Sequence, residues 1–318
     1  MSTPSLTLIT GASGFVGRWT SAAFAVRGLP VVATGRSAPA LLPGVLRGMT
    51  LSPAHDDEHV RTCLRGVRTV VHLAARVHDV HGHTSDEEFD AVNCRWPQRI
   101  AELAAQEGAT RFIFMSSIKV NGDVTVPGRP FTEASDTRPL GGYAVSKARA
   151  ELGLAELAER TGMDVAVVRP PLVYGPGVGA NFLSLMRLVK RGVPLPFRAI
   201  HNARSFIYVE NLADLVVRLA SAPTQPRHTE VYLASDGEDV STPELIRRMA
   251  AAMDRVPRLV PSPGLRTMLR LAGKGGLVQR LWESLQVDSS KARAALQWTP
   301  AISLDEGLRR TAQAMAGS

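Results

Sequence analysis

The stretch TGASGFVG, residues 10–17, directly follows the apolar run SLTLIT (5–10). Its glycines have the spacing GxxGxxG, which permits a tight turn, close approach of a pyrophosphate to the backbone, and packing of a helix against a strand. Free N–H groups and the dipole at the helix N-terminus then favour the anion. We therefore predict a dinucleotide-binding strand–turn–helix unit; the alternative is a glycine-rich turn without a ligand. The residues expected to contact the dinucleotide here are Gly11, Ser13, Gly14, Phe15, Val16 and Gly17.

The first half of the chain alternates short apolar runs with helical stretches. A parallel sheet with helices on both faces follows from this rhythm, and runs that are apolar on both sides fit strands buried on both faces. We therefore predict an α/β fold with a Rossmann-type, doubly wound parallel sheet. The expected strands are 5–10, 31–35, 69–75, 111–117 and 164–170, and the expected helices are 15–27, 56–65, 86–107 and 142–161.

After residue 170 proline and glycine cluster, and the pattern changes to short helices with two strand-like pieces, SFIYV and VYLAS. We predict a dinucleotide-binding domain over 1–170 and a smaller, mostly helical substrate lobe over 171–318, with some segments interleaved. The helices expected in this lobe are 180–191, 210–221, 242–253, 262–272, 289–296 and 303–315.

Composition and charge limit the classes of partner that we expect for this chain. The net charge is +8, but the arginines are scattered and form no basic tract, so we expect no nucleic-acid partner and favour a small anionic ligand. No apolar run reaches the roughly 18 residues that span a bilayer, and the N-terminus lacks a signal-peptide pattern, so we expect no membrane partner. Two cysteines, Cys63 and Cys94, give neither a disulfide framework nor zinc spacing, which predicts a cytoplasmic location.

The end of the second expected strand bears on the choice of dinucleotide. An NAD site usually carries an acidic residue about 20 residues beyond the glycines, bonded to the ribose hydroxyls. This chain has no acidic residue before Asp56 and instead reads Gly35-Arg36-Ser37. A guanidinium at this place pairs well with a 2′-phosphate. We therefore favour NADP(H), with NAD(H) possible and Arg36 as a solvated turn residue the alternative.

A second group of residues indicates the chemistry. Tyr143 and Lys147 are one helical turn apart, and Ser116 and Ser117 end the fourth expected strand. A neighbouring ammonium favours the ionised phenol and should bring its pKa towards neutral pH, while the serine hydroxyl holds a substrate oxygen. This arrangement suits proton transfer on an alcohol or ketone oxygen while a hydride moves at carbon.

In combination these motifs resemble the extended short-chain dehydrogenase/reductase family of NAD(P)-dependent nucleotide-sugar epimerases, dehydratases and reductases. The resemblance covers nearly the whole chain and rests on TGASGFVG, VVHLAA, SSIKVNG, YAVSK, RPPLVYGPG, RSFIYVENLAD and LQWTPAISLDEGL. It implies that Ser117 is the catalytic serine, Tyr143 the acid–base and Lys147 its partner. It also implies cofactor contacts from Leu73, Ala74, Ala75, Asn93, Ser116, Tyr143, Lys147 and Pro170.

The resemblance further implies a clamp for a nucleotide diphosphate in the second lobe. Asn181 and Arg204 match this clamp, with an N-cap and a solvated arginine as the alternatives, and Arg76 and His78 begin a loop on the substrate side. A UDP-linked amino sugar of bacterial surface polysaccharides is the implied substrate class. We expect no metal at the histidines of HDVHGH (78–83), because nicotinamide chemistry needs none.

Three reactions of the family compete. A 4,6-dehydratase is disfavoured, because Ile118 and Lys119 stand where an acidic pair is required. We expect reduction at C4 of a UDP-4-keto-6-deoxy-N-acetylhexosamine, with 4-epimerisation of a UDP-hexose or UDP-N-acetylhexosamine as the alternative and a non-catalytic dinucleotide sensor as a third. The family also implies a homodimer through the helices 86–107 and 142–161. The apolar side chains that could support that contact, or could equally face their own sheet, are Ile100, Leu103, Leu152 and Leu157.

Overall fold

A seven-stranded parallel sheet forms the centre of the protein, which we describe from a computed structural model covering residues 5–39, 45–77, 84–273 and 275–316. The strand order β3-β2-β1-β4-β5-β6-β9 reverses direction at β1, as in doubly wound Rossmann-type sheets. The predicted fold class is thereby confirmed. The strands are β1 (Leu6–Thr10), β2 (Val31–Gly35), β3 (Val45–Thr50), β4 (Val67–His72), β5 (Arg111–Met115), β6 (Asp164–Arg169) and β9 (Thr229–Leu233).

Helices cover both faces of this sheet, because successive residues of each central strand are apolar and point to opposite sides. In β5, Phe112 and Phe114 pack towards one face, and Ile113 and Met115 towards the other. The first face carries α2 (Asp57–Leu64), α4 (Trp96–Gln106) and α5 (Gly141–Thr161). The opposite face carries α1 (Phe15–Val26), α7 (Val209–Ser221) and α11 (Ser290–Leu296).

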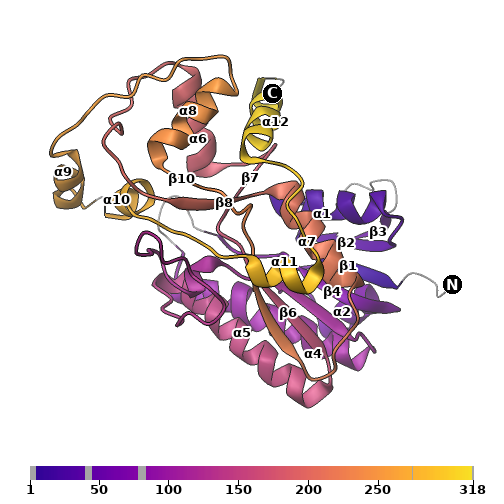
Figure 1. Cartoon of the computed structure of the whole chain (residues 1–318). Helices are drawn as coiled ribbons and strands as arrows, with labels where there is room; N and C mark the ends of the chain where they lie inside the picture. Colours follow the sequence, from indigo (N-terminus) through magenta and orange to yellow (C-terminus); the bar gives the residue numbers. More distant parts are fainter. Residues whose placement is uncertain (1–4, 40–44, 78–83, 274, 317–318) are drawn as a thin grey trace.

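A smaller lobe stands at one end of the sheet (Figure 1). Its three-stranded sheet has the order β10-β8-β7, and its core is rich in aromatic rings, among them Tyr174, Phe182, Phe206 and Tyr208. The strands are β7 (Leu172–Tyr174), β8 (Arg204–Tyr208) and β10 (Asp239–Val240). The helices are α6 (Ala180–Lys190), α8 (Thr242–Ala251), α9 (Leu265–Leu271), α10 (Gly275–Trp282) and α12 (Leu304–Ala316).

The two parts of the chain are interwoven. β9, α7 and α11 all follow residue 170, yet they belong to the main sheet and to the core on its second face. The division into domains 1–170 and 171–318 stays a prediction. The sequence pattern missed β3 and α10, which contain the exposed Arg47 and begin with the pair Gly275-Gly276, respectively.

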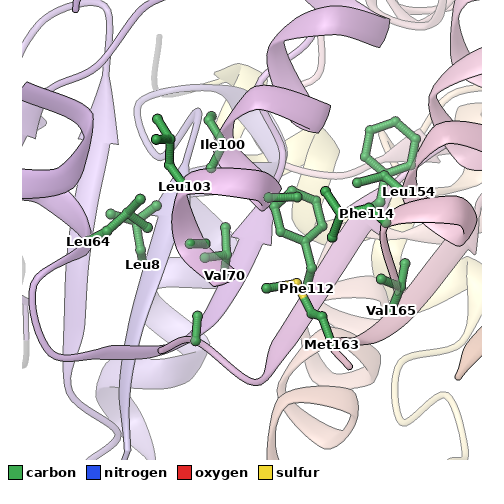
Figure 2. Packing of buried hydrophobic residues seen from close by; sticks show 14 of the residues in the cluster. Leu8, Leu64, Val70, Ile100, Leu103, Phe112, Phe114, Leu154, Met163 and Val165 are labelled. Atoms are coloured by element: carbon green, nitrogen blue, oxygen red, sulfur yellow. The ribbon is translucent and has the colours of Figure 1, made fainter. Parts of the chain in front are cut away.

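Part of the helix expected over 86–107 has a wider turn. It is made of α3 (Asp86–Asp90), a π-helical turn η1 (Ala91–Arg95) and α4. Of the side chains considered for a dimer, Ile100, Leu103 and Leu157 are buried in the protein's own core, and Figure 2 shows the first two beside Leu8 and Leu64. Leu152 on α5 is 68% exposed.

Two further observations bear on partners and location. In the described part of the chain, no helix is both long and apolar enough to cross a membrane. Cys63 and Cys94 are free and buried.

Candidate active site

The glycine loop between β1 and α1 is packed too tightly for any larger residue at two of its positions. Gly11 has φ +68°, and a Cβ there would lie 2.7 Å from the backbone nitrogen of Ala74. A Cβ on Gly17 would lie 2.1 Å from the carbonyl oxygen of Gly11. Gly14 is the N-cap of α1 and has no side chain that could cap the helix. The loop therefore forms a cradle of backbone N–H groups at a helix N-terminus, which fits a pyrophosphate.

The other residues predicted to contact the cofactor gather around this loop. The Leu73 N–H donates to the Thr10 carbonyl (3.2 Å) and the Ala74 N–H to the Thr10 hydroxyl (3.3 Å), so the segment after β4 lies against the end of β1. A Cβ on Gly35 would lie 2.8 Å from Oγ of Ser13, which places the end of β2 beside the loop as well. Arg36 follows and is exposed, as is Ala75 after β4.

The predicted catalytic trio is brought together at the C-terminal end of β5. Ser117 lies just beyond this strand, and its side chain is close enough to that of Tyr143, in the first turn of α5, to lower the pKa of the phenol. One turn further, the Lys147 ammonium donates to the carbonyl oxygen of Met115 (2.8 Å) and lies 4.5 Å from the ring centroid of Phe114. Ligands of open α/β sheets bind at this edge of the sheet.

Burial controls the electrostatics of the trio. Lys147 is 1% exposed, and burial lowers its pKa to about 7, an effect that the nearby Glu151 carboxylate opposes. Burial also raises the pKa of the Tyr143 phenol, and the hydrogen bond from Ser117 opposes this rise. The expectation that the lysine would bring the phenol pKa down is therefore wrong for this structure, because desolvation of the phenolate outweighs the other influences.

A buried polar network lies directly beneath the trio. The Ser116 hydroxyl donates to the carboxylate of Glu151, which is ion-paired with Arg169, and Arg169 also donates to the side-chain oxygen of Asn121 (3.0 Å). Ser116 is 3% exposed, so its hydroxyl is directed into this network, whereas the neighbouring Ser117 meets Tyr143. The role of Glu151 was not predicted from the sequence, although this residue follows Lys147 by one helical turn.

Asn93 holds the loop after β4 against α5. It is fully buried in the π-helical turn η1, accepts from the Arg76 N–H (2.8 Å), and donates to the Arg76 carbonyl (3.0 Å) and to Oγ of Ser146 (3.2 Å). Its amide is thus occupied by protein partners. The Arg76 side chain is ion-paired with Glu88 (3.5 Å).

The end of β6 contacts the segment that carries Ser117. The buried Pro170 presents its carbonyl to the Ile118 N–H (3.0 Å) and so fixes the turn that carries Ser117. His78 and the other histidines of 78–83 lie outside the described residues. Among the described residues, no group of three or more His, Cys, Asp or Glu side chains could hold a metal ion.

Asn181 and Arg204 line one cavity of about 340 Å³ in the second lobe. Asn181 lies in the first turn of α6, which begins at Ala180, so it does not cap the helix from outside as one interpretation had it. Burial lowers the pKa of Arg204 to about 10, and its guanidinium donates to the carbonyl oxygen of Glu283 (2.9 Å). Phe197 lines the same cavity.

A second cation of this cavity was missed from the sequence. Arg280 of α10 lines it together with Arg204, so two guanidinium groups converge on a space that is otherwise mostly apolar. The sequence signal was weak, because α10 itself was not predicted and arginine is frequent throughout the chain. Two arginines beside an apolar cleft suit a diphosphate attached to a planar base.

Comparisons with known proteins show which family the chain belongs to. The model of the NAD dependent epimerase/dehydratase family matches residues 7–234. The chain belongs to this family. The predicted resemblance to the extended short-chain dehydrogenases/reductases is confirmed.

Three of its relatives show the range of the family. A UDP-glucose 4-epimerase from Vibrio cholerae is 39% identical over 317 residues, covering 98% of this chain and 95% of that protein. The structure of MoeE5 in complex with UDP-glucuronic acid and NAD has a TM-score of 0.80 at 26% identity, covering 98% and 99% of the two chains. A 2-alkyl-3-oxoalkanoate reductase from Stenotrophomonas maltophilia is 25% identical, covering 95% and 97%. The family thus includes proteins named as epimerases and as reductases.

Proposed function

We propose that this member of the family acts at C4 of a UDP-sugar and that its net reaction is 4-epimerisation. The observation that carries the proposal is the juxtaposition of the Ser117 and Tyr143 side chains at the end of β5, with the buried Lys147 one turn away. A nicotinamide dinucleotide bound on the glycine loop supplies the hydride acceptor and donor. The tight packing around Gly11 and Gly17 fits its pyrophosphate.

The chain's own residues would move the proton and hold the substrate. As a phenolate, which burial disfavours in the protein alone and a cationic nicotinamide would favour, Tyr143 takes the proton of the C4 hydroxyl while the C4 hydrogen leaves as hydride. It returns the proton when hydride comes back to the opposite face of the resulting ketone. Ser117 holds the C4 oxygen by a hydrogen bond. Lys147 donates at the strand end beneath the phenol, and Asn181, Arg204 and Arg280 would hold the diphosphate.

The preference for epimerisation rests on the comparison. The sequence favoured the ketoreductase because Arg36 replaces an acidic ribose partner, but the 39% identical relative that covers 98% of this chain is named a UDP-glucose 4-epimerase. The exposed Arg36 beside the glycine loop still supports the second candidate, reduction of a UDP-4-keto-6-deoxy-N-acetylhexosamine with NADPH. Whether the enzyme is an epimerase or a reductase, we propose that it serves the synthesis of bacterial surface polysaccharides.

The cofactor that the purified protein retains separates the two reactions. An epimerase returns the hydride and has no need to release the dinucleotide, so stoichiometric NAD in the purified protein, together with interconversion of UDP-glucose and UDP-galactose, is the expected result. An empty site that prefers NADPH, with turnover of a 4-keto sugar nucleotide, would favour the reductase instead. Tyr143→Phe should abolish either activity. Unchanged activity would support the alternative of a non-catalytic dinucleotide sensor.

Assembly and location complete the proposal. We propose a homodimer formed by α4 and α5, since Leu152 is 68% exposed on α5, and a cytoplasmic location. Leu152→Glu should convert a dimer to a monomer in light scattering; a wild-type monomer would contradict the dimer.

A further inference from the structure

The end of the second lobe carries an excess of positive charge. Six exposed cations lie on the last turn of α6, on the loop that follows it and on the loop after α8. We call this surface the basic end; its residues are Arg187, Lys190, Arg191, Arg198, Arg255 and Arg258. Figure 1 shows α6, α8 and their following loops at the top of the view, away from the parallel sheet.

Two arginines beside the basic end are ion-paired within the protein. Arg247 and Arg248 of the adjacent α8 are both ion-paired with Glu244. No carboxylate within 4.0 Å is found for any residue of the basic end in the part of the chain that the structure describes. The chain's formal charge is +8, so a large part of its uncompensated charge gathers at one end. Such a surface attracts anions over about a Debye length.

Two hollows make this end a shaped surface. One, of about 640 Å³, is lined by Arg187, Lys190, Arg191 and Arg255. The other, of about 460 Å³, lies next to it and shares Arg255. None of the described residues that line them carries a carboxylate or an aromatic ring. The absence of aromatic rings from these linings disfavours nucleic acid, for which stacking platforms are typical.

The two loops are fixed to each other, so the cations are held in place. The Leu195 N–H donates to the Arg258 carbonyl (2.7 Å), and the Val260 N–H donates to the Leu195 carbonyl (2.9 Å). The Ser262 hydroxyl also donates to the carbonyl of Pro196 (2.5 Å). Because this pairing spares the surface much of the entropy cost of ordering, binding should need little rearrangement.

Apolar side chains stand among the charges. Val256 is 87% exposed and lies between Arg255 and Arg258 in the sequence, while Val193 is 38% and Val260 39% exposed. Binding of a small anion would need only the cations and would not require exposed valines beside them. At a bilayer surface, by contrast, cations meet acidic headgroups while apolar side chains enter the boundary with the acyl chains.

We infer that the basic end binds the surface of a membrane rich in acidic phospholipids. The sequence predicted no membrane partner because no segment could span a bilayer, but contact with one leaflet needs no spanning segment. The cations would lie against headgroup phosphates, with Val256 inserted between them. The catalytic trio and the cavity of Asn181 and Arg204 take no part in this contact, so the inference does not depend on the proposed function.

Vesicle sedimentation of the full chain tests the inference. The probe is phosphatidylcholine vesicles with and without 30% phosphatidylglycerol. We expect binding to the acidic vesicles alone, weakening as salt rises. Arg191→Glu combined with Arg255→Glu should weaken this binding at least tenfold, whereas the matched pair Arg47→Glu and Arg68→Glu, far away on the main sheet, should leave it within twofold.

A second variant tests the apolar part. Val256→Ser should weaken binding severalfold and keep its salt dependence, and circular dichroism with thermal melting should show every variant folded. Three outcomes would overturn the inference: no preference for acidic vesicles, equal losses from both arginine pairs, or displacement by millimolar glycerol phosphate at constant ionic strength, which would assign the surface to free phosphates. Binding of an oligonucleotide without binding of acidic vesicles would assign it to nucleic acid and would equally overturn the inference.

Discussion

Replacing Lys147 with methionine should remove a pH dependence of stability that the wild-type protein carries. The amine is 1% exposed, and burial lowers its pKa from 10.5 to about 7. These two values differ by about 3.5 pH units, and each unit corresponds to about 1.4 kcal/mol. The buried amine therefore lowers the free energy of unfolding by up to about 5 kcal/mol at acidic pH, where it is charged in both states.

The direction of the effect follows from proton binding. Above pH 10.5 the amine is neutral in both the folded and the unfolded chain, so its burial as a charge costs nothing. Between pH 7 and 10.5 the unfolded chain binds the proton and the folded chain does not, so stability rises with pH. From pH 7 to pH 9 the wild type should gain up to about 3 kcal/mol relative to Lys147→Met, which has no proton to exchange.

Urea unfolding at pH 7 and pH 9 measures this difference. The Asp236 carboxyl, whose pKa burial raises to about 7, also titrates in this range, but both proteins contain it and its contribution cancels. Lys190→Met, the same change at an exposed lysine of α6, should keep the wild-type slope. Parallel pH dependences in wild type and Lys147→Met would refute the buried, partly neutral amine and with it our account of the trio's electrostatics.

Three other substitutions test the loop, the clamp and the scaffold. Gly17→Ala places a Cβ 2.1 Å from the Gly11 carbonyl oxygen, so dinucleotide affinity in calorimetry should fall at least 100-fold; retained affinity would contradict the cradle. Arg204→Met should raise KM roughly 10–100-fold with little change in kcat, and a loss confined to kcat would argue against the clamp. Asn93→Ala leaves the Arg76 N–H without its partner and should lower the free energy of unfolding by about 1–3 kcal/mol in urea titrations, with unaltered stability counting against its structural role.

Features set by local spacing were predictable from the sequence. The glycine interval fixes the turn between β1 and α1, and a separation of four residues places Tyr143 and Lys147 on one face of a helix whatever surrounds them. Most helix limits were also close to those observed, because amphipathic periodicity is a local property. The long helix α5, for example, was expected over 142–161 and is observed at Gly141–Thr161.

Features that depend on distant partners were not predictable. β3 is an edge strand that pairs with β2 alone, so exposed residues such as Arg47 interrupt its apolar pattern. Arg280 reaches the cavity of Arg204 only because α10 lies beside the start of β8, where the Gln279 carbonyl accepts from the Arg204 guanidinium (3.5 Å). The prediction of a lowered phenol pKa was wrong for the same reason. A YxxxK spacing does not show how completely the surrounding protein excludes water from the phenol, and here desolvation raises the pKa more than the contact with Ser117 lowers it.

The consecutive serines after β5 show how the buried network and the trio depend on each other. Neighbouring residues of an extended chain point in opposite directions, so Ser116 meets the Glu151 carboxylate while Ser117 meets the phenol of Tyr143. Glu151 lies one turn beyond Lys147 on α5 and is ion-paired with Arg169 at the end of β6. The helix that carries the phenol is thus joined to two adjacent strand ends through one buried carboxylate. Because removing one partner of a buried pair leaves the other uncompensated, any shift of α5 along the sheet is costly, and the distance between phenol and serine is held by the scaffold beneath them.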